Sequence, residues 1–242
     1  MKIEATKLEA FCNILGALVR ESRLHVTADG ITTGAVDPAN VAMVRATIPA
    51  TAFREFGAGK CDIGMDVAKW KGAVNVMKKP DALITVDLPP NGKIGLADGS
   101  YSYKIVPLDL TTIRKDPTVP SFQLPNSLEV DAAEFAKAMK ALAVVGDKVA
   151  FTIKDDMLEL ATEGDSDHLR KEIPGTKAGG KKNETAARSL FSLDYMIEIA
   201  KPVSGAGKVT VSLGIDHPVR LDFTVDEIEA SYAIAPRIEQ GE

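Results

Sequence analysis

The residues best suited to chemistry form an acidic cluster in the second half of the chain. Asp165, Asp167 and His168 lie together in GDSDH (164–168), and Asp155-Asp156 comes shortly before. Carboxylates and an imidazole can hold a divalent ion that activates water, so a metal-dependent hydrolase is one alternative. The chain has only three histidines and no HExxH, P-loop or GxSxG motif, and aspartates are ordinary turn residues. We therefore expect a non-enzymatic protein without metal or cofactor.

A second chemical candidate is a pair of lysines on a predicted helix. Lys137 and Lys140 are one turn apart and lie off the apolar stripe formed by Phe135, Met139 and Leu142, so they project together into solvent. Lysines without neighbouring aromatic or base-reading side chains suit phosphate contact without sequence readout. A solvated helix face that only keeps the protein soluble would look the same, and it is the simpler interpretation of the lysines alone.

Composition narrows the class of protein. The 242 residues carry a net charge of −5, which argues against general polyanion binding unless positive charge is concentrated locally. No apolar run approaches the roughly 20 residues needed to span a bilayer, and the N-terminal stretch lacks the apolar core of a signal peptide. The two cysteines, Cys12 and Cys61, form no CxxC motif. We expect a soluble cytoplasmic protein, with no role at a membrane.

The helices and strands that would position these residues occur in the same order in both halves of the chain. Each half shows a strand, an amphipathic helix and three strands, followed by a second such unit. The helices are predicted at about 6–20, 67–78, 131–144 and 193–201. Ile48-Pro49 and Ile173-Pro174 end equivalent strands and stand as far apart as Ile3 and Leu128, which begin the two copies. This internal repeat predicts an α+β fold of two repeated domains built from βαβββ units, residues 1–110 and 127–242.

The segment between the copies, residues 111–126, has its own character. It contains Pro117, Pro120 and Pro125 and shows neither a helical nor a strand period, so it should be an extended connector. Phe122 and Leu124 sit inside it at strand-like spacing, although a plain spacer would not need apolar side chains.

Several stretches together resemble the PCNA-type DNA sliding clamps of archaea and eukaryotes, with details closer to the archaeal members. The resemblance runs from end to end of the chain. It rests on ADGI (28–31), AVDPANVAMV (35–44), IGMD (63–66), KIVPLD (104–109), ATEGDSD (161–167) and AIAPRIEQGE (233–242).

The resemblance implies a clamp fold and a ring of three subunits around duplex DNA. Helices would line the hole and antiparallel sheets the outside of a pseudo-sixfold ring. The ring would tether DNA polymerase, clamp loader, flap endonuclease and DNA ligase, whose short motifs carry a glutamine and a hydrophobic-aromatic plug. The implied peptide pocket comprises Val36, Asn40, Val41, Met43, Phe122, Leu124, Pro125, Pro218, Ala235, Pro236, Arg237 and Ile238. A small apolar cleft and an extended tail suit such a peptide.

The resemblance also implies a DNA-facing surface and a subunit interface. The expected DNA-facing residues are Lys71, Lys78, Lys137, Lys140 and Lys201. Relatives often carry basic residues where this chain has Glu9, Ala10, Gly16 and Asp194, so we expect a weakly positive inner surface. Subunits would pair the strand near 102–107 with the strand near 167–172, and the expected contacts are Tyr101, Tyr103, Ile105, Leu169 and Ile173.

Two alternatives stay open within the ring interpretation. The chain could be one member of a heterotrimer, or a specialised checkpoint-type clamp subunit. The complete DPANVAMV segment and the terminal APRIE favour a general replication clamp, associated with the nucleoid of a prokaryotic cell.

Overall fold

The computed structural model describes residues 1–57, 59–89, 92–118, 124–178 and 187–237. Within them, a strand, a helix and three strands follow one another four times, which confirms the predicted α+β repeat. The described residues separate into two compact units. One comprises residues 1–38, 43–118 and 225–230, and the other comprises residues 39–42, 119–224 and 231–242 as far as they are described. No helix within the described ranges is long and apolar enough to cross a membrane.

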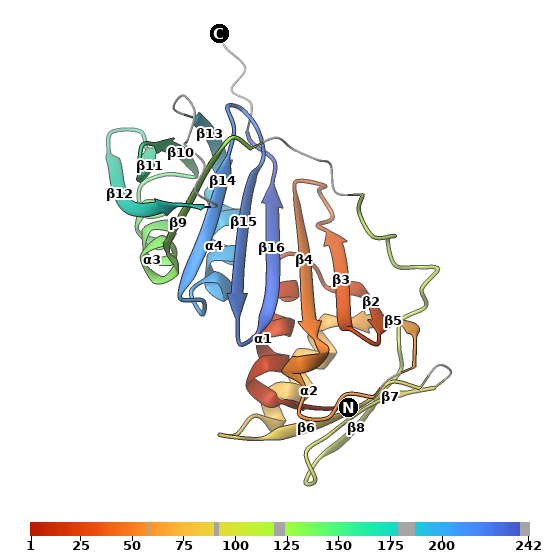
Figure 1. The fold of residues 1–242 in the computed structure, drawn as a ribbon. Helices are drawn as coiled ribbons and strands as arrows, with labels where there is room; N and C mark the ends of the chain where they lie inside the picture. The colour runs from red at the N-terminus through yellow and green to blue at the C-terminus, as the bar shows by residue number, and fades with distance from the viewer. Residues whose placement is uncertain (58, 90–91, 119–123, 179–186, 238–242) are drawn as a thin grey trace. The chain divides into compact units, whose positions relative to one another are not determined.

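The first unit contains two groups of antiparallel strands and two helices (Figure 1). One group has the order β1-β6-β7-β8, and the other has the order β5-β2-β3-β4. The elements are β1 (Lys2–Glu4), α1 (Ala5–Gly16), β2 (Glu21–Thr27), β3 (Gly30–Val36), β4 (Ala42–Pro49), the 3-10 turn η1 (Ala50–Ala52), β5 (Cys61–Asp66), α2 (Val67–Met77), β6 (Leu83–Asp87), β7 (Ile94–Ala97) and β8 (Ser102–Ile105).

The core of this unit lies where the two helices pack on each other and on the strands. α1 buries Leu8, Phe11 and Leu15, and α2 buries Trp70 and Val74. The strands supply alternate residues, because successive side chains of a strand point to opposite faces. In β2, for example, Ser22, Leu24 and Val26 are buried while the residues between them are not.

The second unit repeats this plan. Its strands follow the order β13-β10-β11-β12-β9-β14-β15, and α3 packs against α4. The elements are β9 (Asn126–Asp131), α3 (Ala132–Leu142), β10 (Lys148–Lys154), β11 (Met157–Glu163), β12 (His168–Lys177), β13 (Ala187–Ser192), α4 (Leu193–Val203), β14 (Lys208–Leu213) and β15 (Val219–Val225). The last strand, β16 (Ile228–Ile234), has residues in both units.

Aromatic side chains fill the centre of the second unit. Phe135 of α3 lies edge-on to Phe151 of β10 with ring centroids 6.0 Å apart, and Phe151 lies edge-on to Phe191 of β13 at 5.2 Å. Edge-to-face pairs at these distances add to the stabilisation from burial. The predicted stripe of Phe135, Met139 and Leu142 is fully buried, so the remaining side of α3 is free to present polar residues.

All four helices begin directly where a strand ends. The carboxylates of Asp66 and Asp131 accept hydrogen bonds from the amides of Lys69 and Glu134, three residues later, which caps α2 and α3. α1 differs from the prediction, because it ends at Gly16 and not near residue 20. Leu18 lies in the turn after α1 and is half-buried, and Val19 beyond that turn is buried, since burial of an apolar side chain does not require helical backbone.

Candidate functional site

The chain leaving β8 is held against the first unit at successive points, beginning at Leu108. The amide of Leu108 donates to the carbonyl of Gly64 in β5 at 2.9 Å. A Cβ at position 64 would lie 2.2 Å from the Leu108 carbonyl oxygen, so the close approach requires glycine there. This bridge holds the chain to β5 just before residues 111–126, the predicted connector.

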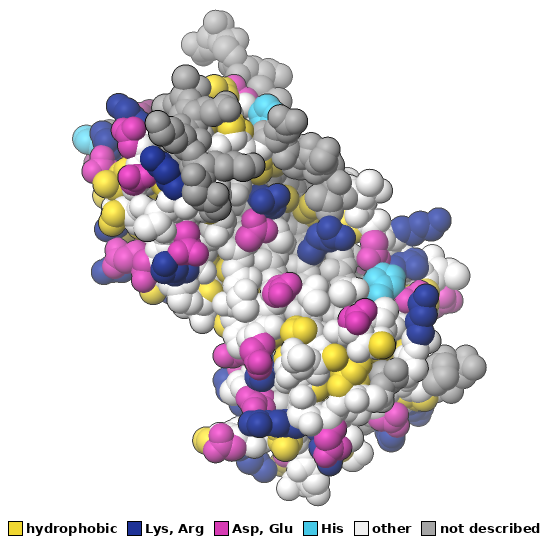
Figure 2. Space-filling model, in the orientation of Figure 1, with side chains coloured by type: hydrophobic (Ala, Val, Ile, Leu, Met, Phe, Trp, Pro, Cys, Tyr) yellow, Lys and Arg dark blue, Asp and Glu magenta, His cyan; other side chains and the backbone are white. Residues whose placement is uncertain are grey.

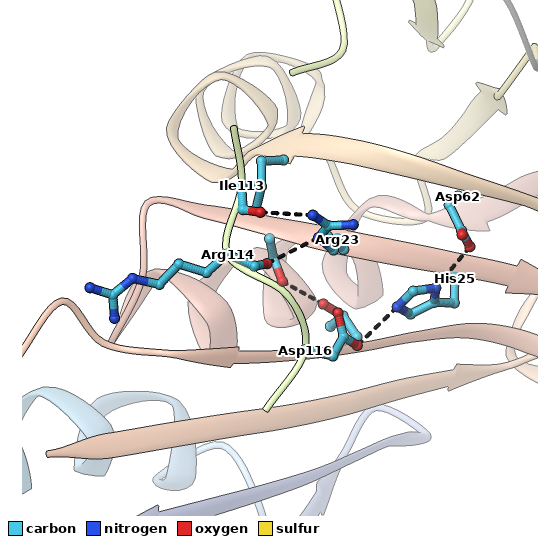
Figure 3. Close-up of polar contacts among 8 residues, drawn as sticks. Arg23, His25, Asp62, Ile113, Arg114 and Asp116 are labelled. Atoms are coloured by element: carbon cyan, nitrogen blue, oxygen red, sulfur yellow. Dashed lines mark hydrogen bonds and ion pairs between the residues drawn. The ribbon is translucent and has the colours of Figure 1, made fainter. Parts of the chain in front are cut away.

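Arg23, on β2, holds the next turn of the connector (Figure 3). Its Nε donates to the carbonyl of Arg114 at 3.0 Å, and one Nη donates to the carbonyls of Ile113, at 2.8 Å, and Leu110. Arg114 in turn donates to the carbonyls of Asp37, at 3.2 Å, and Pro38, at 3.3 Å, just beyond β3. One guanidinium therefore serves several backbone acceptors in a segment without regular structure, as its fixed fork of donors allows.

His25, two residues further along β2, holds the connector at Asp116 (Figure 3). Its Nδ1 lies 2.8 Å from a carboxylate oxygen of Asp62 in β5, and its Nε2 lies 2.9 Å from one of Asp116. Ionised carboxylates only accept, so both ring nitrogens must carry a proton for both bonds to form. Burial alone lowers the pKa of His25, but its hydrogen bonds and charge interactions with Asp62 and Asp116 outweigh burial and raise that pKa above its ordinary value of 6.5.

This geometry predicts a pH-dependent anchor. A histidine whose folded-state pKa is raised contributes stability that is fully present below about pH 6.5 and is lost as pH rises through the folded-state pKa. We expect amide exchange at residues 113–116, corrected for intrinsic rates, to accelerate across that window. The variant His25→Gln should remove the pH dependence. A NMR titration of His25 giving a pKa below 6.5 would contradict the doubly bonded arrangement.

The chain after β16 is held within the second unit. The amide of Ala235 donates to the carbonyl of Val41 at 2.8 Å, and the amide of Arg237 donates to the carbonyl of Leu190 at 2.7 Å. The Arg237 guanidinium donates to the carboxylate of Asp147 at 2.9 Å, and this bond lowers the pKa of Asp147. Backbone and side-chain bonds together fix the direction of this segment up to the last described residue.

The helices carry exposed lysines, and only some of these lysines form ion pairs with acidic side chains. Lys137 and Lys140 are exposed, and no acidic partner lies within ion-pair distance of either among the described residues. Lys78 pairs with Glu9 at 2.6 Å, and Lys201 pairs with Glu198 at 2.5 Å. Basic and acidic side chains are likewise interspersed on the face drawn in Figure 2. Local pairing therefore reduces the positive charge that the lysine count alone indicates.

Two strand edges have no partner along most of their length in the described chain. β8 ends its group of strands, and residues 168–174 of β12 pair only with β11. Tyr101 is 49% exposed, in a turn closed by bonds from its own amide and that of Ser100 to the Asp98 carboxylate. Tyr103 and Leu169 are half-buried. Ile105 and Ile173 are buried within their own units, so they support these strands from inside.

Comparison with known proteins assigns the family. The family model for the C-terminal domain of proliferating cell nuclear antigen matches residues 118–238. A Methanoregula boonei protein named DNA polymerase sliding clamp is 42% identical over 98% of this chain and 97% of its own length. A protein of the same name from Methanoculleus marisnigri is 40% identical, with the same coverage. This chain belongs to the PCNA family.

Solved structures agree with the PCNA fold. The structure described as the C-terminal region of FEN-1 bound to A. fulgidus PCNA gives a TM-score of 0.90 at 32% identity, over 99% of this chain and 98% of that one. PCNA from Thermococcus kodakaraensis gives a TM-score of 0.86 at 21% identity, over 98% of this chain and 99% of that one. The expected clamp fold, α+β with antiparallel sheets, is confirmed.

The residues expected to form the PCNA peptide pocket are distributed over several segments. Val36 and Met43 face each other across β3 and β4 and are half-buried, as is Leu124, whereas Pro125 is exposed. Asn40 is exposed and adopts a positive φ of 59°, which turns the chain between β3 and β4. Val41, Pro218, Ala235 and Pro236 are half-buried, and Arg237 is exposed. Phe122 and Ile238 lie outside the described residues, and the pocket itself stays a prediction.

The acidic cluster around GDSDH does not form a metal-ligand group. Among the described residues, no three His, Cys, Asp or Glu side chains are arranged to hold a metal ion. The Gly164 amide instead donates to the Asp167 carbonyl at 2.8 Å, closing the turn between β11 and β12. Asp155 adopts a positive φ of 54° in the turn between β10 and β11. The structure thus places the aspartates in hairpin turns, and His168 begins β12.

Arg23, His25 and Asp147 hold the predicted connector and the chain after β16, and none of them was among the site residues predicted from the sequence. A usable signal was present on β2, where Arg23 and His25 alternate with the buried Leu24 and Val26 and so share one face of the strand. Their acceptors lie about 90 residues further along the chain, which is beyond the reach of local patterns.

Proposed function

We propose that this chain is the subunit of a DNA sliding clamp, in which three copies form a closed ring around duplex DNA. The observation that carries the proposal is the match over almost the whole chain to proteins named DNA polymerase sliding clamp. The clamp would move freely along DNA and confer processivity on a polymerase. It would have no catalytic activity of its own, and it would work in the cytoplasm, associated with the nucleoid.

The partner enzymes would dock through short peptide motifs at the predicted pocket, which combines Val36, Asn40, Val41 and Met43 with the connector and the chain after β16. The likeness to a PCNA bound to the C-terminal region of FEN-1 supports flap endonuclease as one partner. DNA polymerase, clamp loader and DNA ligase would use the same site. The ordered backbone at Ala235 and Arg237 suits pairing with an extended peptide, because an existing strand direction lowers the entropy lost on binding.

Within the ring, residues 1–110 and 127–242 would act as the two clamp domains, and residues 111–126 as the connector between them. The unpaired edge of β8 on one subunit would meet the edge of β12 on the next. A head-to-tail interface of this kind either closes into a ring or polymerises, and closure covers both edges. Three identical subunits satisfy this arrangement, and the native mass of the assembly tests it directly.

The DNA surface would comprise Lys71, Lys78, Lys137, Lys140 and Lys201, with topology rather than affinity retaining the clamp. We expect weak binding to linear duplex that falls steeply with salt, because a few lysine–phosphate contacts bind mainly by releasing counterions. Rings placed on nicked circular DNA by a clamp loader should survive gel filtration at a salt concentration that releases them after linearisation. Equal loss from circular and linear DNA would refute encirclement.

Lys137→Ala with Lys140→Ala provides the matched test of the DNA surface. Each phosphate contact contributes about 0.9 to the slope of log affinity against log salt, so the double variant should show a shallower slope on linear DNA. Lys154→Ala, on an exposed position of β10, should leave the slope unchanged. Tight retention of linear DNA above physiological salt by the unmodified protein would contradict the weakly positive inner surface.

A further inference from the structure

A pocket of about 340 Å³ lies in the first unit, beneath the beginning of the connector. Apolar side chains of Leu18, Val19, Val36 and Ile113 contribute to its wall, with Pro38 at one side. Only Val36 is shared with the predicted peptide pocket. The cavity is large enough to hold one or two side chains of a bound peptide, and its wall offers them apolar contact.

The pocket is held in shape by bonds already described. Ile113, Arg114 and Lys115 form one side of it, and Arg23 fixes that side through the carbonyls of Ile113 and Arg114. Arg114 ties the same side to the carbonyls of Asp37 and Pro38. A ligand entering here would therefore lose little affinity to ordering the protein.

The lining of the pocket carries a net positive charge, although the chain as a whole is negatively charged. Four cations line it, namely Arg20, Arg23, Arg114 and Lys115, against the single carboxylate of Glu21. Arg20 and Lys115 are exposed, and within the described residues neither has a carboxylate within ion-pair distance. The nearest acidic residue of the connector, Asp116, is held by His25. The chain as a whole carries −5, so this local excess is a property of the site.

We propose that this pocket binds an acidic, apolar segment of a partner protein: one bulky apolar side chain in the cavity and flanking carboxylates at Arg20 and Lys115. The proposal rests on the proposed function, since the segment would flank the motif that enters the predicted peptide pocket. Partners with acidic flanks would be bound in preference to partners with basic ones, and the preference would weaken with salt.

The test uses the intact assembly and fluorescent peptides that carry the glutamine and hydrophobic-aromatic motif. One peptide has no extension, others carry Asp-Leu-Glu-Asp at either end, and a matched set carries Lys-Leu-Lys-Lys. Exposed charge pairs each change affinity by about two- to fivefold. An acidic extension at one end should therefore tighten binding by about three- to tenfold at low salt, and the basic extension should not.

Variants locate the effect. Arg20→Glu with Lys115→Glu should abolish the gain from the acidic extension while leaving the unextended peptide bound as before. Lys60→Glu makes the same type of charge change at an exposed residue of the first unit outside the pocket, and it should retain the gain. A gain that persists in the double variant, or no gain at either end, would overturn the proposal. If the unextended peptide did not bind at all, the result would refute the predicted peptide pocket and not the pocket proposed here.

A second measurement does not depend on the predicted peptide pocket. In protein with ¹³C-labelled methyl groups, the isolated acidic segment should shift the signals of Val19, Val36 and Ile113, and shift them less in the Arg20→Glu/Lys115→Glu variant. Unshifted methyl signals at millimolar peptide would exclude the site. A single-stranded oligonucleotide of equal charge that produced the same shifts and displaced the peptide would identify a nucleic-acid contact instead, and would equally refute a peptide site.

Discussion

Replacing both Tyr101 and Val106 with glutamate should convert the proposed ring of three subunits into single subunits. The two side chains flank β8, and they are 49% and 62% exposed in the isolated chain. Large apolar side chains beside an unpaired strand edge indicate a contact surface. Burying an unpaired polar group costs about 2 kcal/mol, and more for a charge, so two substitutions should weaken each interface about a thousandfold or more.

Light scattering during gel filtration checks this result. At micromolar concentration the unmodified protein should show the mass of three chains, and the double variant should show about 25.8 kDa with an unchanged circular dichroism spectrum. Ile215→Glu is the matched control, because Ile215 is 56% exposed but lies in the loop between β14 and β15 and belongs to neither β8 nor β12. A trimeric double variant would show that β8 is not the interface strand. A monomeric unmodified protein would favour a heterotrimer.

The fold could be predicted because each helix and turn shows a local sequence pattern, and the same patterns recur along the chain. Apolar spacing fixed the position of all four helices within a few residues, since each has a buried stripe such as Phe135, Met139 and Leu142. The aspartates were recognised as ordinary turn residues, and Asp155 indeed adopts a positive φ in the turn between β10 and β11. Helix ends were less certain. The helix predicted at about 6–20 begins at Ala5 without any side-chain cap and ends at Gly16.

The functional contacts were harder to predict because they join distant segments. The pairing of Lys78 with Glu9 changes the charge on the helix surface, and neither residue predicts the other from its neighbours. Likewise Arg237 donates a hydrogen bond to Asp147, which lies 90 residues away in the sequence. The lysines, the tail and the connector could be named from sequence, but the side chains that neutralise or hold them depend on tertiary structure.

Arg23→Met should release the beginning of the connector while leaving the two units folded. The substitution keeps an unbranched apolar stem and removes the donors to Leu110, Ile113 and Arg114. Hydrogen bonds from a charged donor contribute about 1.5–3 kcal/mol each when well shielded. Water can replace part of that at a half-exposed residue, so we expect the local opening free energy to fall by about 2 kcal/mol in total. Amide exchange over residues 110–116 should then accelerate about thirtyfold.

Two further variants distinguish the loss of the Arg23 hydrogen bonds from the loss of a positive charge. Arg188→Met removes a guanidinium from an exposed position of β13 in the second unit, where no described side-chain hydrogen bond is broken, and it should leave exchange at residues 110–116 unchanged. Arg23→Lys keeps the charge but cannot present a planar fork of donors, so it should restore only part of the protection. Full protection in Arg23→Lys would mean that charge alone holds the segment. Unchanged exchange in Arg23→Met would mean that the bridge at Gly64 and the His25 contact hold the connector without Arg23.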